Sequence, residues 1–152
     1  MDSDRIEKTI VLKASRSQVW RALTSAGEFG SWFGARMNGP FVAGERATGR
    51  ITIPNYDHLT LELLIDRIEP ESLFSYRWHP YAVEADVDYS SEPMTLVEFH
   101  LADDPGGIKL TVIESGFDQI PMARRATAYR LNDGGWAAQM TNIAWQVTGA
   151  GR

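Results

Sequence analysis

The sequence predicts an α+β domain in which a curved antiparallel sheet wraps around one long C-terminal helix. Between residues 44 and 115 apolar and polar residues alternate, which is typical of half-buried strands. Between residues 121 and 147 apolar residues recur at steps of three, four and seven, which is typical of a helix that buries one face. A run of strands followed by one long helix is an α+β pattern. The helix is therefore expected to pack across the concave face of the sheet.

Two short helices are expected after a first strand. Residues 6–13 alternate in polarity and are rich in β-branched side chains, which predicts the strand. Ser15 lies three residues before Gln18, the spacing of a capping box, so a helix should start here and end near Gly27. The apolar cluster around Trp32 allows at most a second, brief helix, because glycines flank it.

The remaining strands are separated by one long loop and one tight turn. Residues 79–93 are polar and acidic, and we expect them to form an exposed loop over one end of the sheet. Residues 103–107 contain Pro-Gly-Gly, a strong turn signal. The expected strands are 46–53, 59–68, 73–78, 94–102 and 108–115.

The last segment predicts one long helix. Pro121 suits its first turn, because proline lacks the N–H that is unpaired there. Roughly 27 residues would rise about 40 Å, enough to cross a small domain. The stripe expected to face the sheet consists of Met122, Ala126, Tyr129, Trp136, Met140, Ile143 and Val147.

Length and composition restrict the function classes. A chain of 152 residues predicts a single domain, here residues 1–152 with a core of about 6–147. A net charge of −5 and the lack of a basic cluster argue against nucleic acid as a partner. Cysteine is absent, which excludes disulfides and thiolate chemistry. No segment reads as a signal peptide or a membrane span, so we expect a cytoplasmic protein without membrane insertion.

The sequence carries no motif for a metal or a cofactor. His58, His79 and His100 lie on different predicted elements, and no pair has the spacing of a zinc-binding helix. Gly106-Gly107 belongs to a hairpin turn rather than to a phosphate-binding loop. Ser115-Gly116 does not fit the pattern of a nucleophile elbow. We therefore expect neither a metal nor a cofactor.

Glu114 is the first candidate for chemistry. Ile108, Leu110 and Val112 alternate on the inward face of the last strand, and continuing the alternation places Glu114 on the same apolar side. There its carboxylate would be partly desolvated and could serve as a general base or as a hydrogen-bonding anchor. Alternatively, it lies at the rim of the sheet, in contact with solvent or paired with an arginine.

A polar interruption of the long helix is the second candidate. The stripe between Tyr129 and Trp136 directs either Asn132 or Asp133 towards the sheet, next to Gly134-Gly135. Two glycines inside a helix cost about 1 kcal/mol each relative to alanine, so they need a compensating reason. That reason is close packing on the sheet, a break or kink, or room for a ligand with Asn132 or Asp133 as its polar contact.

The aromatic content is high, with five Trp, five Tyr and six Phe. These rings either fill the core or line a pocket, since ligand pockets are mostly apolar with a few placed polar groups. Trp136 fits the core, whereas pocket and core are equally well supported for residues beside glycine-rich turns. The residues expected to line a ligand pocket are Trp32, Phe33, Tyr76, Trp78, Glu114, Phe117, Asp133, Trp136 and Met140.

Several short motifs, taken in order, resemble a known family. They are Trp20-x-x-Leu23, Trp32, Pro93-x-Thr95-Leu96-Val97, Glu114-Ser115-Gly116-Phe117 and Gly135-Trp136. Together they are similar to proteins named after the C-terminal domain of the activator of heat-shock protein 90 ATPase, within the START-like (SRPBCC) superfamily. The resemblance covers about residues 6–147. It implies the helix-grip (Bet v 1/START-like) fold, with the long helix held in a curved sheet.

The resemblance implies three functions. Members of the superfamily hold hydrophobic molecules between helix and sheet, so the first hypothesis is binding of a lipid, polyketide or aromatic metabolite. The second is a polyketide cyclase- or hydrolase-like enzyme with Glu114 or Asp133 as acid/base. The third is a single-domain chaperone-interaction module that uses the outer sheet face or the acidic segment 84–92. The protein is expected to be a monomer or a homodimer, since an exposed edge strand favours pairing.

Overall fold

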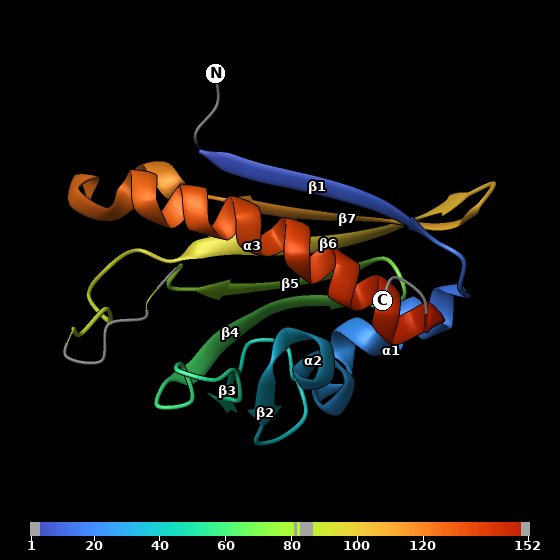
Figure 1. Ribbon diagram of the computed structural model, residues 1–152, viewed down its shortest axis with the longest axis horizontal. Coiled ribbons are helices and arrows are strands. Elements are labelled where there is room, and N and C mark those ends of the chain that lie inside the picture. The colour runs from blue at the N-terminus through green and yellow to red at the C-terminus, as the bar shows by residue number, and fades with distance from the viewer. Residues whose placement is uncertain (1–3, 81, 83–86, 150–152) are drawn as a thin grey trace.

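The computed structural model describes residues 4–80, 82 and 87–149, and it has the expected α+β architecture. Seven strands form one antiparallel sheet, two short helices follow the first strand, and a long helix ends the chain (Figure 1). The elements are β1 (Arg5–Leu12), α1 (Arg16–Thr24), α2 (Ala26–Phe33), β2 (Ala35–Met37), β3 (Arg46–Ile51), β4 (Thr60–Glu69), β5 (Leu73–Trp78), β6 (Thr95–Asp104), β7 (Gly107–Ser115), the short 3₁₀ turn η1 (Phe117–Gln119) and α3 (Met122–Thr148).

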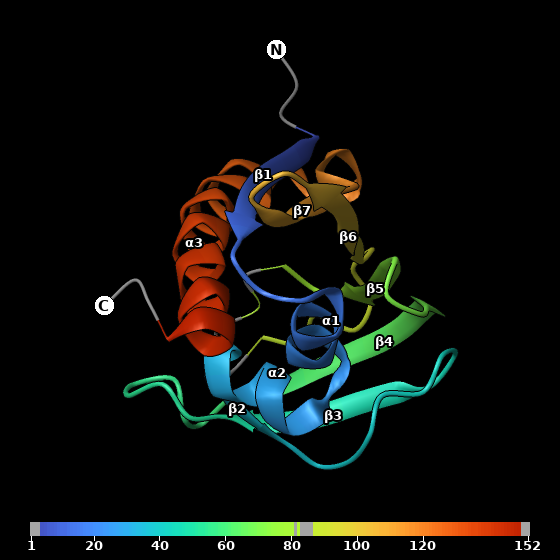
Figure 2. The ribbon, with the colours of Figure 1, turned by 90° about the vertical axis from the view of Figure 1, so that its right-hand side faces the viewer.

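The sheet has the order β1-β7-β6-β5-β4-β3-β2, so the first strand pairs with the last. β1 and β2 are its two edges. Figure 2 shows the sheet as a curved wall, with α3 along its open side and α1 and α2 across one end. The space between α3 and the concave face is therefore bounded by β-strands on one side and by the helices on the other.

Two serines set the bounds of the first helices, and Ser25 both ends α1 and begins α2. Ser15 and Gln18 form the predicted capping box at the start of α1. The helix ends at Thr24 rather than near Gly27, because Ser25 accepts a hydrogen bond from the backbone N–H of Glu28 and starts a second helix at once. The following strand, β2, was not predicted, since three residues are too short to show an alternation.

α3 is one continuous helix of 27 residues, as predicted from its stripe. The C-terminal part of the stripe is confirmed, because Trp136, Met140 and Ile143 are buried. Two residues of the N-terminal part were wrong: Met122 is 79% exposed, and Ala126 is exposed as well. Tyr129 is partly buried and packs against the core as predicted, and Ala128 is the fully buried residue in that region. The physical reason is that the first turns of α3 project beyond the end of β1, where no sheet covers them (Figure 1).

The core on the concave face of the sheet is rich in aromatic side chains. Phe74, Tyr76 and Phe99 are fully buried on β5 and β6, and their rings are neighbours at centroid distances of 5.8–6.2 Å. Phe29 of α2 joins this cluster through an edge contact with Tyr76. These large rings therefore fill the centre of the concave face.

Candidate functional site

Glu114 is completely buried on the concave face of the sheet. Ile108, Leu110 and Val112 precede it on the same face of β7, and all three are buried. Its neighbours across the sheet are Ile6 on β1 and Val97 on β6. The predicted inward position is therefore confirmed, and the alternative position at the solvated rim was wrong. Nor does Glu114 form an ion pair with any residue that the structure describes.

Four neutral donors surround the carboxylate of Glu114. The indole N–H of Trp78 donates to Oε2 at 2.7 Å, and the hydroxyl of Thr95 donates to the same oxygen at 2.6 Å. The indole N–H of Trp136 donates to Oε1 at 2.8 Å. The amide Nδ2 of Asn132 donates to Oε1 at 3.0 Å and to Oε2 at 3.3 Å. These donors come from β5, β6 and α3, so the carboxylate joins the long helix to the sheet.

This arrangement explains why an acidic residue is tolerated in the core. Burying a charge without partners is very costly, whereas hydrogen bonds to a charged group are about twice as strong as neutral ones. The indole N–H groups of Trp78 and Trp136 can only donate, so they match the oxygens of a carboxylate, which accept hydrogen bonds. Glu114 thereby fixes the orientation of two tryptophan rings and of the Asn132 amide.

Tyr76 lies beside this cluster without joining it. Its side chain is fully buried, and its hydroxyl has no hydrogen-bond partner among the described residues. Burial raises the pKa of the Tyr76 phenol well above its usual value of 10.0, and the nearby Glu114 carboxylate raises this pKa further. Tyr76 is therefore a neutral phenol at physiological pH.

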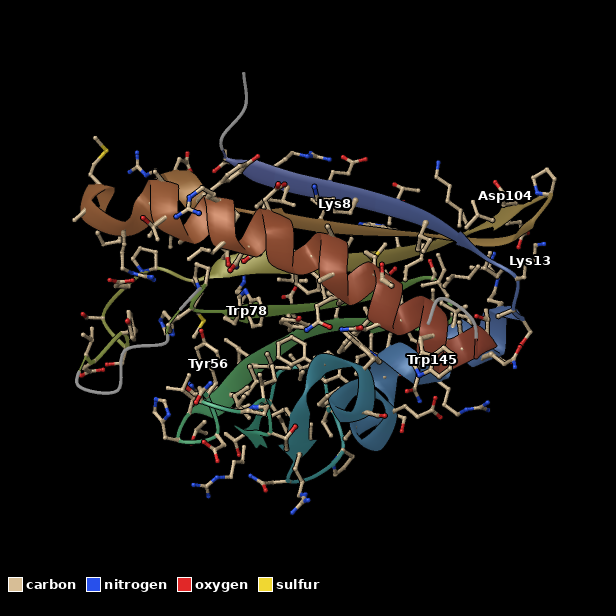
Figure 3. The ribbon with its side chains drawn as sticks, in the orientation of Figure 1. Lys8, Lys13, Tyr56, Trp78, Asp104 and Trp145 are labelled. Atoms are coloured by element: carbon tan, nitrogen blue, oxygen red, sulfur yellow. The ribbon has the colours of Figure 1, made fainter. Side chains whose placement is uncertain are left out.

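Two cavities adjoin the Glu114 cluster on the side of α3. The larger has a volume of about 580 Å³ and the smaller about 460 Å³. The larger one extends along β3, β4 and the loop between them, and Tyr56 of this loop and Trp78 lie on the left in Figure 3, away from Trp145. The smaller one extends between α2 and the C-terminal half of α3. Both are lined by Phe33, Ile53, Trp78, Asn132 and Gly135.

The glycine pair in α3 does not serve close packing. A Cβ atom added at Gly134 or Gly135 would meet no heavy atom within 4 Å beyond its neighbours in the helix. The helix is also unbroken there, because α3 continues from Met122 to Thr148. Gly135 lines both cavities, whereas Gly134 lines neither. Of the three explanations offered for the glycines, open space beside the helix is the one that matches the surroundings of Gly135.

One wall of the larger cavity comes from the acidic loop between β5 and β6. His79, Asp88 and Ser90 line the cavity from this loop. Arg124 at the start of α3 holds the loop: its guanidinium pairs with the carboxylate of Glu92 at 2.8 Å and donates to the carbonyl of Pro80 at 2.9 Å. Glu84 and Asp86, which also belong to the predicted acidic segment, lie outside the described residues.

A family model matches almost the whole chain. The model describes the Activator of Hsp90 ATPase homolog 1-like proteins, and it matches residues 13–147. The chain belongs to this family. A search of curated proteins returned no significant match.

Solved structures of similar fold include further proteins of low sequence identity. MLL2253 from Mesorhizobium loti has a TM-score of 0.73 and 20% identity, with 93% of this chain and 95% of that chain covered. The Aha1 dimer from Colwellia psychrerythraea has a TM-score of 0.69 and 16% identity, with 97% and 98% covered. DynU16, a putative protein in the dynemicin biosynthetic locus, has a TM-score of 0.71 and 21% identity over 96% of this chain, but only 48% of DynU16 is covered. These likenesses show the helix-grip fold.

In this member of the Hsp90 ATPase activator-like family, four of the predicted pocket residues line a cavity. Phe33 and Trp78 line both cavities, and Trp32 and Trp136 line the smaller one. Trp32 is also part of the core, since it is 4% exposed and its indole N–H donates to the carbonyl of Ala22.

The other predicted pocket residues lie elsewhere. Tyr76, Phe117 and Met140 are buried and line neither cavity, and Phe117 packs edge-on against Tyr129 of α3. The side chain of Asp133 does not face the sheet interior, because it pairs with Lys8 of β1 at 3.0 Å, half-exposed. Asn132 is the residue that reaches Glu114.

Sequence reasoning missed the contribution of the loop between β3 and β4. Ile53, Tyr56 and Leu59 all line the larger cavity, although Ile53 was assigned to a strand that ends at Ile51. Three large apolar residues in a short loop of a small domain are a usable signal, because a loop needs no such residues unless they cover something apolar.

The described residues contain no group of three or more histidine, cysteine or acidic side chains able to hold a metal ion. Across the same residues, no helix combines the length and the apolar character that a membrane crossing requires.

Proposed function

We propose that this protein binds a small, largely apolar molecule in the cavity between α3 and the sheet. The observation that carries the proposal is the cavity of about 580 Å³, which falls within the range of roughly 300–1,000 Å³ that is usual for ligand sites. Aromatic and aliphatic side chains such as Phe33, Trp78 and Leu61 form most of its walls. Such walls would make apolar contacts with a lipid, a polyketide or an aromatic metabolite.

Asn132 supplies the placed polar group of this site. Its Nδ2 must face Glu114, because the carboxylate oxygens of Glu114 accept hydrogen bonds from it. The amide oxygen Oδ1 therefore points away from Glu114, and it has no hydrogen-bond partner among the described residues. Because Asn132 lines both cavities, Oδ1 is available to accept a hydrogen bond from a donor on the ligand.

In this proposal Glu114 is a positioning residue. It lines neither cavity, and both of its oxygens already accept hydrogen bonds from protein donors. The alternative in which Glu114 or Asp133 acts as acid/base therefore has less support, since Asp133 is engaged with Lys8. Chaperone interaction stays a prediction, although the family takes its name from an activator of Hsp90.

The adjacent glycines of α3 allow a matched test. Gly135 lines both cavities, so Gly135→Leu is expected to reduce their volume, whereas Gly134→Leu adds the same side chain at a position that lines neither. Each substitution removes one helical glycine, which favours the helix by about 1 kcal/mol in either case. The two variants therefore differ in cavity volume and share the effect on the helix.

The experiment is a thermal-shift screen of the parent protein against lipids, polyketide-like compounds and aromatic metabolites. A ligand at a hundredfold excess over its Kd adds about 2.7 kcal/mol, which raises the Tm of a chain of this size by about 5–11 °C. We expect this shift in the parent and in Gly134→Leu, and its loss in Gly135→Leu. A hit that shifts Gly135→Leu as much as the parent would show that the cavity is not the binding site.

A further inference from the structure

Among the described residues, the side chains with a fixed charge in the cavity walls are acidic, and His79 is the one basic side chain that lines the larger cavity. No lysine or arginine lines either cavity among the residues that the structure describes. Two acidic residues line the larger one. Glu62 is neutralised by an ion pair with Arg46 at 2.8 Å, but Asp88 makes no ion pair with the described residues and accepts a hydrogen bond from the backbone N–H of Ser90. The side-chain and backbone hydrogen bonds from Ser90 lower the pKa of Asp88, so it is ionised at neutral pH.

A second negative charge lies directly behind the cavity wall. The four partners of Glu114 are neutral, so its charge is shared among hydrogen bonds and is not cancelled by a cation. Two basic residues next to the site have acidic partners of their own: Arg124 pairs with Glu92 and Lys8 pairs with Asp133. The carboxylates of Glu114 and Asp88 therefore have no lysine or arginine partner among the described residues.

Two aromatic rings in edge contact form part of the wall that both cavities share. The rings of Phe33 and Trp78 line both cavities, with centroids 5.8 Å apart and planes inclined by 66°. They form a corner rather than a stack. The indole N–H of Trp78 donates to Glu114, which pushes electron density into the ring and makes its face more attractive to a positive charge.

We propose that the ligand of this cavity is a primary ammonium on an apolar body, with the cation in the corner of Phe33 and Trp78 and an N–H donated to Asn132 Oδ1. This inference rests on the proposed function and narrows it to one class of ligand. A carboxylate or phosphate would meet the two negative charges of Glu114 and Asp88, and it would find no donor at Asn132, whose Nδ2 is committed to Glu114. Charge, aromatic geometry and amide orientation all favour the same class.

The test compares three probes that share one alkyl chain: decylammonium, decanol and decanoate. Isothermal titration calorimetry at pH 7, with each probe below its micelle concentration, gives three values of Kd. We expect decylammonium to bind about tenfold or more tightly than decanol, because cation–π contacts in a desolvated corner are strong, and decanoate to bind most weakly. The inference is overturned if decylammonium binds no more tightly than decanol, or if decanoate binds as tightly as decylammonium.

Two variants separate this inference from non-specific attraction and from the proposed function. Gly135→Leu keeps the net charge of −5 and adds a side chain at a residue that lines both cavities, so binding that is unchanged in this variant is attributed to the protein surface. Decanol binding to the parent without a preference for decylammonium would overturn the ligand class and leave the proposed function standing. Failure of all three probes to bind would count against both.

The origin of the preference is tested by removing each negative charge. Glu114→Gln keeps the size of the side chain and should reduce the ratio of the decanol Kd to the decylammonium Kd about two- to fivefold. Because this buried variant can fail to fold, Asp88→Asn at the exposed mouth provides the same measurement with little structural risk. A ratio that stays unchanged in both folded variants would contradict the electrostatic part of the inference.

Discussion

Thr95 offers the most direct test of the Glu114 anchor. Its hydroxyl is fully buried and donates to Glu114 Oε2 at 2.6 Å. Thr95→Val removes this hydrogen bond with almost no change in shape, and valine is well suited to a strand. The carboxylate then keeps its other donors, Trp78, Trp136 and Asn132. The variant therefore isolates the contribution of a single hydrogen bond, made to a buried charge, to the free energy of unfolding.

The magnitude follows from the kind of bond that is lost. A hydrogen bond to a charged group contributes about 1.5–3 kcal/mol, more than the roughly 0.5–1.5 kcal/mol of a neutral one. Burying a methyl group in place of the hydroxyl returns about 0.5–1 kcal/mol. Thr95→Val should therefore lower the free energy of unfolding by about 0.5–2.5 kcal/mol, which lowers the Tm by about 1–10 °C.

The control is the same substitution on the other face of the sheet. The hydroxyl oxygens of Thr111 on β7 and Thr9 on β1 are 3.2 Å apart and form an exposed hydrogen bond between neutral groups. Thr111→Val should change the free energy of unfolding by no more than about 0.5 kcal/mol. The assay is urea unfolding followed by far-UV circular dichroism, since tryptophan fluorescence would also report the disturbed Trp78 and Trp136. If Thr95→Val is as stable as Thr111→Val, the carboxylate of Glu114 is not the anchor described here.

Three further outcomes are expected. Tyr76→Phe should leave the free energy of unfolding at pH 7 unchanged or higher by up to about 1 kcal/mol, because it removes a buried hydroxyl without a described partner. Burial raises the pKa of Tyr76, so above pH 10 the unfolded chain loses a proton that the folded protein keeps; urea titrations should show the parent losing stability more steeply there than the variant. Arg124→Met should speed amide hydrogen exchange of residues 87–92, measured by mass spectrometry, because Arg124 holds this loop through Glu92 and Pro80. Exchange in β7 should stay unchanged. A loop that exchanges at the same rate in the variant and in the parent would contradict this. Ser15→Ala should cost about 1 kcal/mol in urea unfolding through loss of the helix cap, and a neutral result would contradict the capping box.

Much of the fold could be predicted because local patterns report side-chain direction. Strand alternation placed Glu114 on the inward face, and the Ser15–Gln18 spacing predicted the first helix; both are confirmed. The pattern was less informative for α3. Successive residues of a helix differ in direction by about 100°, so the stripe alone could not decide between Asn132 and Asp133. Packing against β1 and β7 decided it, with Asp133 turned to Lys8 and Asn132 to Glu114.

The sequence by itself determined the α+β class, the single long helix, the family resemblance and the inward position of one carboxylate. Only the tertiary structure decided what meets that carboxylate and where open space remains. The donors from Trp78, Thr95, Asn132 and Trp136 are 36 to 18 positions away from Glu114 along the chain, and no local period relates them. Their convergence depends on the curvature of the sheet and on the rotation of α3 about its axis. Those two quantities are set by packing across the whole domain, and they also leave the cavities beside Gly135 unfilled.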